Sequence, residues 1–419
     1  MTPAVKRVDR LYLNVPFRPR LRPWHTRLIW GWQVVELIRI ETTDGTAGWG
    51  ERLPHYTWGE TSDAALDWTL GRPVGELLGD DRLGPALQMA AYDAAGKALG
   101  VPAHRLFGRP MVREEVGLAW WATDLPPEVL AEEARDAAAA GYRVLKTKPR
   151  PWFDVWRQLE LVGAATPEDF TVGLDWNGTL RDAGTAKPVL LDLERFAKVA
   201  VFETPIPHED VRGYRELRSV LGRPLYMHLV DDPGLDETVD ACDGYVIHDG
   251  IVSVLTKGLR AAAFNKPFWL QVVGLGLTTA LCAQLAAVLT HARRPHVSCL
   301  NIWENDLLAD PLRVAHGNLA VPAGPGLGVE IDEASVHRYA VAGPTPPERP
   351  GELLTVRWPT GRSIDFTSYA ACNDAFLMGN EAPQERGVTL DVTPDDGSSQ
   401  WRSRFATARA RDHRLFGTC

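Results

Sequence analysis

Between residues 115 and 305 the chain repeats a pattern of short apolar runs, each ended by polar residues and separated by stretches rich in Ala and Leu. Buried strands that alternate with helices predict βαβ units and a parallel sheet. Eight such runs predict an α/β fold with a closed (β/α)8 barrel, in which the carboxyl ends of the strands carry the chemistry. The runs are VGLAWWATD, YRVLKTKPR, FTVGLDWNG, VAVFETPIP, RPLYMHLVD, GYVIHDG, KPFWLQVVG and HVSCLNIWEND.

Polar residues mark the ends of seven of these runs. They are Lys148, Asp175, Glu203, His228, His248, Gln271 and Glu304, at intervals of 20 to 33 residues. A single polar residue at a strand end usually belongs only to the turn that follows. Seven in register, several of them carboxylate, Lys or His, indicate a functional edge of the barrel rather than a purely structural feature.

The barrel has a segment on either side of it. Residues 1–112 predict an α+β domain, because VVELIRIETTDGTAGWGE reads as two strands around a turn at Asp44-Gly45. A helical pattern begins at Pro85 and is closed by Gly100 and Pro102. We assign residues 113–344 to the barrel. Residues 345–419 are polar and contain many Pro, Gly and Arg residues, and we expect them to pack back on the first domain.

Composition excludes several classes of function. The five cysteines are scattered without a CxxC pair, so neither a zinc cluster nor a disulfide framework is indicated. The chain has no apolar run of membrane-spanning length and no apolar signal-peptide core at its N-terminus, so we expect a cytoplasmic protein. The net charge of −9 and the absence of a basic block argue against nucleic acid as a partner. A small anionic substrate reads only local charge and stays compatible with this composition.

Two carboxylates end neighbouring predicted strands. Asp175 and Glu203 can therefore converge, and two carboxylates with water suit a hard divalent cation such as Mg²⁺. Such a cation would hold a substrate carboxylate and stabilise the enediolate formed when a neighbouring proton is removed. The alternative is that each carboxylate caps the helix after its strand.

Two lysines lie one strand earlier. Lys146 and Lys148 are separated by one residue, so both point to the same face of the strand. One can neutralise an oxygen of the substrate or of the metal site, and the other can act as a base if neighbouring cations lower its pKa. Lysine pairs of this kind are also common on protein surfaces, and the position before Asp175 favours the functional interpretation.

The motifs resemble those of the enolase superfamily, in the branch of mandelate racemase and muconate lactonizing enzyme. The matches are Lys146-Thr147-Lys148, GLDWNG at 173–178, FETP at 202–205, VPAGPGLGVEID at 321–332, the helix around 91–97 followed by HRLFG, and WGE at 49–51. They occur in family order across residues 5 to 340. The resemblance implies an α+β capping domain over a modified barrel, with Asp175 and Glu203 as metal ligands. It also implies that loops near 17–32 and 53–60 set substrate choice.

The third metal ligand departs from the family pattern. The family has Glu or Asp at the fifth strand, whereas this chain has His228, with Asp231 and Asp232 just beyond. Imidazole suits Mn²⁺ or Zn²⁺ better than Mg²⁺, which prefers oxygen. We therefore expect Mg²⁺, or Mn²⁺ or another divalent metal if His228 is the ligand. The alternative is that His228 only lines the pocket.

The last three strands also differ from the family. On the sixth strand His248-Asp249 stands where the family has a lysine base or an aspartate that supports a histidine. On the seventh, Gln271 occupies the place of the catalytic histidine of the racemases, and Gln cannot accept and return a proton. On the eighth, Glu304 matches the acid that hydrogen-bonds the enolate oxygen. A standard His–Asp dyad is therefore not expected.

Aromatic residues cluster at the predicted strand ends. If half of their indoles face the site, they shape a partly apolar pocket, and the substrate carries a ring or an apolar arm. The alternative, barrel packing, accounts for the other half. The indoles belong to Trp120, Trp121, Trp152, Trp176, Trp269 and Trp303. We expect Asn177, Gln271, Trp120 and Trp303 to contact substrate.

These features predict a lyase or isomerase that acts on a small carboxylic acid. Lys148 would remove the proton α to the carboxylate. Loss of a β-hydroxyl would make the enzyme a dehydratase of an acid sugar or related hydroxy acid, which we favour. Return of a proton from His248 would make it a racemase or epimerase. A diverged member that binds an acid without turning it over is the third possibility, and the resemblance implies a homo-oligomer.

Overall fold

The computed structural model describes residues 2–56, 59–232, 234–348, 351–379 and 381–416. The N-terminal domain contains a four-stranded antiparallel sheet in the order β14-β1-β2-β3. Its strands are β1 (Val5–Asn14), β2 (Val34–Thr42), β3 (Ala47–Arg52) and β14 (Ala340–Val341), and its helices are α1 (Arg22–Leu28), α2 (Asp63–Thr69) and α3 (Pro85–Leu99). The predicted hairpin turns at Gly45, whose φ is +85°. Gly100 ends α3 in a left-handed conformation, as predicted.

The sheet and α3 approach each other unusually closely. A Cβ at Gly50 would lie 2.0 Å from the backbone oxygen of Ala86, so only glycine fits there. The C-terminal half of α3 also meets the loop at 324–328. Asp93 accepts hydrogen bonds from the backbone nitrogens of Trp49 (2.9 Å) and Leu327 (2.8 Å). Two of the motifs that carry the family resemblance are thus joined by one buried carboxylate.

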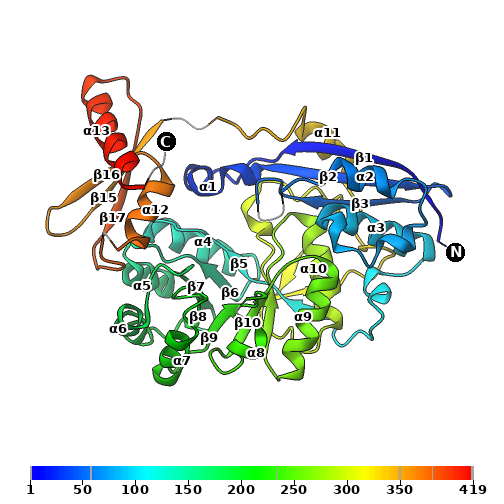
Figure 1. Ribbon diagram of the computed structural model, residues 1–419, viewed down its shortest axis with the longest axis horizontal. Helices are drawn as coiled ribbons and strands as arrows, with labels where there is room; N and C mark the ends of the chain where they lie inside the picture. The colour runs from blue at the N-terminus through cyan, green and yellow to red at the C-terminus, as the bar shows by residue number, and fades with distance from the viewer. Residues whose placement is uncertain (1, 57–58, 233, 349–350, 380, 417–419) are drawn as a thin grey trace.

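The barrel is built on a seven-stranded parallel sheet in the order β11-β10-β9-β8-β7-β6-β5. Figure 1 shows the cap (blue) above this barrel (green and cyan). The strands are β5 (Trp120–Trp121), β6 (Val144–Thr147), β7 (Thr171–Asp175), β8 (Val199–Glu203), β9 (Leu225–His228), β10 (Gly244–Ile247) and β11 (Phe268–Leu270). The helices are α4 (Pro127–Ala139), α5 (Val155–Ala165), α6 (Ala183–Leu193), α7 (Val211–Val220), α8 (Leu235–Thr238), α9 (Ile251–Ala263) and α10 (Gly276–Val288).

The eighth predicted strand is not a regular strand. Residues 292–297 close the ring through isolated parallel bridges, Phe268 to Ala292 and Gln271 to Val297 on one side and Leu118 to His296 on the other. Pro295 cannot donate a backbone hydrogen bond, which interrupts a continuous ladder. The barrel is therefore closed, but with one irregular wall.

A small sheet lies at the amino-terminal end of the barrel, in the order β12-β13-β4. Its strands are β4 (Glu115–Gly117), β12 (Val314–Ala315) and β13 (Asn318–Ala320), and α11 (Glu333–Tyr339) follows. Across the domain boundary, the buried Glu51 of β3 accepts a hydrogen bond of 2.8 Å from the backbone nitrogen of Thr278, in the first turn of α10. The cap is thus attached to a barrel helix by a carboxylate at its N-terminus.

The C-terminal residues form a separate small unit. Its strands are β15 (Glu352–Arg357), β16 (Ser363–Phe366) and β17 (Thr389–Pro394), in the order β16-β15-β17, and its helices are α12 (Tyr369–Leu377) and α13 (Ser399–Phe416). We expected this segment to pack back on the capping domain. It contacts that domain at α1, where Arg27 pairs with Glu352 at 3.0 Å. Its core is completed by Trp152 and Phe153 of the loop between β6 and α5, with Trp24 of α1 packed against it, so the unit contacts both the barrel and the cap.

Within the described parts of the chain, no helix is both long and apolar enough to cross a membrane.

Candidate active site

Strand register brings the predicted charged residues to one face. Lys146 pairs with Gly173, which lies two positions before Asp175, and Asp175 pairs with Glu203. Paired residues in a parallel sheet point to the same side, and so do residues two apart. On β9, Glu203 pairs with Tyr226, and His228 lies two positions after Tyr226. All four side chains therefore point to the interior, near the carboxyl ends of their strands.

The two lysines and two carboxylates form one buried cluster. The Lys146 ammonium lies 2.7 Å from Oε2 of Glu203 and 3.3 Å from Oδ2 of Asp175. The Lys148 ammonium lies 2.8 Å from the same Asp175 oxygen and donates to Oδ1 of Asn177 at 2.6 Å. Gln271 accepts a further hydrogen bond from Lys146. Gln271 thus contacts the charged cluster through Lys146.

Burial and charge divide the roles of the two lysines. Burial tends to lower the pKa of Lys146, but Glu203 and Asp175 overcome it, so the pKa is raised and the ammonium stays charged. Burial lowers the pKa of Lys148, helped by the charges of Arg150 and Lys146 and opposed by Asp175. Burial would raise the pKa of Asp175, yet Lys148 and Lys146 hold it well below its usual range. The pKa values of the two lysines are therefore shifted in opposite directions.

His228 completes a group of three possible metal ligands. The ligand atoms of Asp175, Glu203 and His228 all lie within 4.8 Å of one another. The Nε2 atom of His228 is 3.1 Å from Oε1 of Glu203. Asp231, the alternative ligand, is 95% exposed in its side chain and lies 3.6 Å from Lys257, and Asp232 is also exposed. The geometry brings His228 to the carboxylates.

A second charged group lies beside this triad. Nδ1 of His248 is 3.0 Å from Oδ1 of Asp249, whose other oxygen is 2.5 Å from Lys257. Burial would raise the pKa of Asp249, but His248 and Lys257 lower it to about 2. Asp249 also has a φ of +117°, a strained conformation for a residue other than glycine. The rings of His248 and His228 are 5.3 Å apart between centroids. His248 and Asp249 thus form a dyad on the sixth strand.

Two polar residues of the site were missed from the sequence. His208 follows β8, and its ring lies 5.8 Å from that of His228. Its buried Nδ1 has no hydrogen-bond partner among the residues that the structure describes. Arg150 donates to Oδ1 of Asn177 at 2.6 Å and to the backbone oxygen of Trp176 at 3.0 Å. Its position two residues after Lys148, in KTKPR, is the signal that could have identified it.

The structure corrects one expected substrate contact. Trp120 lies on the outer face of the barrel, where its Nε1 donates to Glu133 at 3.1 Å and its ring meets Tyr142 edge-on. Trp121 is the residue in register with Lys146 and so points inward. The dipeptide WW offers no apolar–polar alternation from which the inward residue could be chosen.

The remaining predicted residues lie under the capping loop at 17–32. Nε1 of Trp303 donates to the backbone oxygen of Trp32 at 3.0 Å, and Glu304 pairs with Arg22 at 3.3 Å. Trp32 in turn stacks on Trp121, with ring centroids 5.8 Å apart. Of the other predicted loop, 53–60, residues 57–58 lie outside the described part of the chain.

Comparison with known proteins places this site in a family context. A family model described as "Enolase C-terminal domain-like" matches residues 129–335. A D-gluconate dehydratase of Thermoproteus tenax is 27% identical over 356 residues, which cover 72% of this chain and 69% of the relative. An o-succinylbenzoate synthase of Geobacillus stearothermophilus is 26% identical, with 73% and 88% covered.

A solved structure shows the same fold. The 2-chloromuconate cycloisomerase from Rhodococcus opacus 1CP superimposes with a TM-score of 0.67 at 20% sequence identity. The match covers 81% of this chain and all of that one. The relatives include dehydratases and a muconate cycloisomerase, which confirms the expected class of lyase or isomerase. The structural match confirms the expected barrel with its cap.

Proposed function

Because the chain belongs to the enolase superfamily, in the branch of mandelate racemase and muconate lactonizing enzyme, we propose that it dehydrates a small hydroxy acid, with an acid sugar as the favoured substrate. The observation that carries the proposal is the pairing of two groups. Lys148 is a buried amine with a lowered pKa that follows β6, and the His248–Asp249 dyad lies beside His228 and follows β10. A base and an acid on separate strands suit removal of a proton and release of a hydroxyl.

The residues divide the reaction as follows. Lys148 takes the proton from the carbon next to the carboxylate, and the electrons of that C–H bond form an enediolate. The C–O bond to the β-hydroxyl then breaks, and His248 supplies the proton with which the hydroxyl leaves as water. The enol that results becomes the 2-keto acid. Lys146 stays charged throughout and neutralises carboxylate oxygens of the substrate.

The donor set fits a divalent cation. Two buried carboxylates and one imidazole converge, and the Lys146 ammonium beside both carboxylates indicates that this position attracts positive charge. Asp175, Glu203 and His228 would hold the cation, Mg²⁺ or, given the imidazole, Mn²⁺. Bound there, it would stabilise negative charge on the substrate carboxylate.

One observation favours a second candidate. His248 has its own carboxylate partner in Asp249, so it could return a proton to the carbon instead of releasing a hydroxyl. The enzyme would then be a racemase or epimerase. A protein that binds the acid without turnover is the third candidate, since the fifth and seventh strands depart from the family pattern.

The test is to incubate the protein with D-gluconate and other acid sugars in D₂O, with Mg²⁺ or Mn²⁺. Wild type should form a 2-keto-3-deoxy acid, and Lys148→Met should lower the rate by about 10²–10⁴-fold. His248→Asn should retain exchange of the α-proton, seen by NMR, while losing product. Exchange without elimination in the wild type would favour the racemase. If the wild type gives neither exchange nor product with any of the acid sugars tested, binding of an acid without turnover is the candidate that remains.

A further inference from the structure

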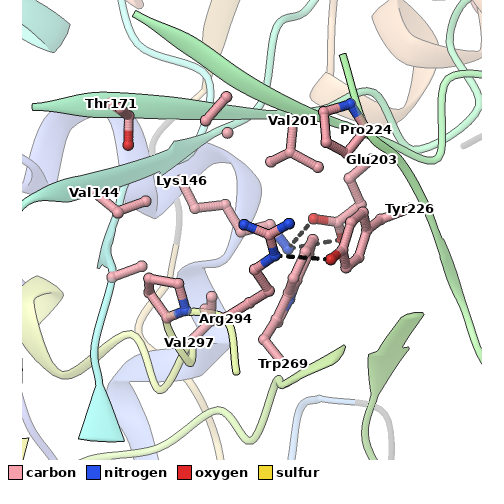
Figure 2. Close-up of a pocket in the computed structure, with 14 residues that line it drawn as sticks. Val144, Lys146, Thr171, Val201, Glu203, Pro224, Tyr226, Trp269, Arg294 and Val297 are labelled. Carbon is pink, nitrogen blue, oxygen red and sulfur yellow. Dashed lines mark hydrogen bonds and ion pairs between the residues drawn. The ribbon is translucent and has the colours of Figure 1, made fainter. Parts of the chain in front are cut away.

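The interior of the barrel is hollow below the charged cluster. A cavity of about 110 Å³ extends from the amino-terminal end of the strands up to Lys146 and Glu203 (Figure 2). Closed barrels of this kind normally fill the region with layers of branched side chains. Here the inward positions at Ala119 and Thr171 carry small side chains, and Gly173 has none. A cavity of this size holds several water molecules or one small organic body.

The walls of the cavity are mostly apolar. Val144, Val201 and Val297 supply aliphatic surface, and the ring of Trp269 stacks on that of Tyr226 with centroids 4.6 Å apart. An apolar cavity of roughly 150 Å³ in another protein binds benzene. The present one is smaller, so it suits a short branched chain better than an aromatic ring.

Two polar groups in the wall bear on what the cavity could bind. Nε1 of Trp269 is buried and makes no hydrogen bond within the described ranges of the chain, although the residue is only 5% exposed. A buried donor without an acceptor costs free energy, so a water molecule is expected to satisfy it.

The second group is a cation at the rim. Arg294 is exposed at the lower end of the cavity, and its Nε donates to the hydroxyl of Tyr226 at 2.9 Å. No ion pair involves this guanidinium among the residues for which the structure gives side chains. Figure 2 shows its hydrogen bond to Tyr226.

We propose that this cavity, which we call the rear cavity, is a second binding site for a small monocarboxylate with a compact branched body. The carboxylate binds Arg294 at the rim, because the Lys146 ammonium in the roof is already paired with Glu203 and Asp175. The apolar body packs on the three valines and Trp269. The rear cavity opens at the end of the barrel opposite the capping loops, so its ligand reaches it without passing the active site.

The two sites share a wall. Lys146 and Glu203 form the roof of the rear cavity and also belong to the charged cluster above it. The inference does not depend on the proposed reaction, because binding at the rear needs neither metal nor turnover.

The experiment uses the full-length protein, without added metal, and 3-methylbutanoate as the probe in ligand-observed NMR. Wild type should give saturable binding. Arg294→Gln removes the charge at an exposed position, and should weaken binding about tenfold. Ala119→Leu fills the lower part of the cavity, and should abolish binding while the unfolding temperature shows that the variant is folded. Arg294→Lys keeps the charge, and its affinity for the probe should lie between those of the wild type and Arg294→Gln.

Several results would overturn the proposal. One is the absence of saturable binding to the wild type. Another is binding by both Arg294→Gln and Ala119→Leu that is as tight as binding by the wild type. Binding that survives both changes and is lost in Lys148→Met would place the probe in the active site instead. That last outcome would bear on the proposed function, whereas the first two would leave it untouched.

Discussion

His228 decides which cation the acidic pair would hold, because its imidazole is the nitrogen ligand in a group otherwise made of carboxylates. We expect calorimetric titration with Mn²⁺ to show one site in the wild type. Asp175→Asn and His228→Ala should each weaken it by at least about tenfold, since each removes a proposed ligand. Mn²⁺ should bind more tightly than Mg²⁺ in the wild type, and this preference should shrink in His228→Ala.

Asp231→Asn is the matched control for the metal titration. Its side chain is almost fully exposed and lies beside Lys257 rather than the triad, so Mn²⁺ affinity should not change. Loss of affinity in Asp231→Asn with no loss in His228→Ala would move the third ligand to Asp231. No binding by the wild type would leave the proposed reaction without its cation.

Glu51 should make stability depend on pH. Burial raises its pKa to about 7, against the hydrogen bond from the backbone of Thr278, which lowers it. The folded state therefore favours the neutral acid. This contribution is fully present below the unfolded pKa near 4.5 and is lost as pH rises through about 7, amounting to about 3 kcal/mol.

The Glu51→Gln variant keeps an acceptor for Thr278 but cannot ionise. The fall in unfolding temperature between pH 4.5 and pH 8 should therefore be smaller in Glu51→Gln than in the wild type. Scanning calorimetry of both proteins across this range would measure it. Parallel curves for the two proteins would show that Glu51 ionises without cost in the folded state.

At the level of elements, the contact between α3 and the loop at 324–328 depends on the absence of a side chain. Gly326 has a φ of +68°, and a Cβ there would lie 2.2 Å from Oδ1 of Asp93. Gly326→Ala should lower the unfolding temperature by more than backbone strain alone would lower it. The added methyl group also displaces the carboxylate that binds Leu327.

Gly45→Ala separates these two effects. Gly45 has a similar φ of +85° but nothing within 4 Å of an added Cβ, so only the strain of about 1–2 kcal/mol applies. Thermal unfolding of the two variants side by side is the measurement. An equal loss in both would mean that α3 and the loop adjust to the methyl group without cost.

At the scale of the whole molecule, Trp152 joins the C-terminal unit to the barrel. It is fully buried, donates to Asp124 at 2.9 Å and meets Tyr369 edge-on with ring centroids 5.2 Å apart. Trp152→Ala should destabilise this docking by about 3–5 kcal/mol. Limited proteolysis should then release the C-terminal unit faster than from the wild type, with cleavage between α11 and β15. Trp152→Phe should behave between the two, and unchanged cleavage in Trp152→Ala would refute the role.

How far the sequence could predict the molecule follows from the range of each signal. The barrel and its charged edge were predictable, because strands repeat along the chain and alternation fixes which side Lys146 and Lys148 share. The face of the strand to which Trp120 points was not predictable, since a two-residue strand of identical residues has no alternation. The docking of the C-terminal unit depends on Trp152, some 200 residues away in sequence, and no local pattern carries such a contact.

The irregular eighth wall gives the barrel a seam. Residues 292–297 are joined to their neighbours by isolated bridges, whereas strands β5 to β11 are paired with one another along ladders. In hydrogen-exchange experiments, local opening follows the weakest paired segment of a fold. Amide protons along this seam should therefore exchange before those of β7 and β8. Because Val297 and Arg294 also border the rear cavity, the ring would open first beside its hollow interior, and solvent would reach the buried ammonium of Lys146 from that side.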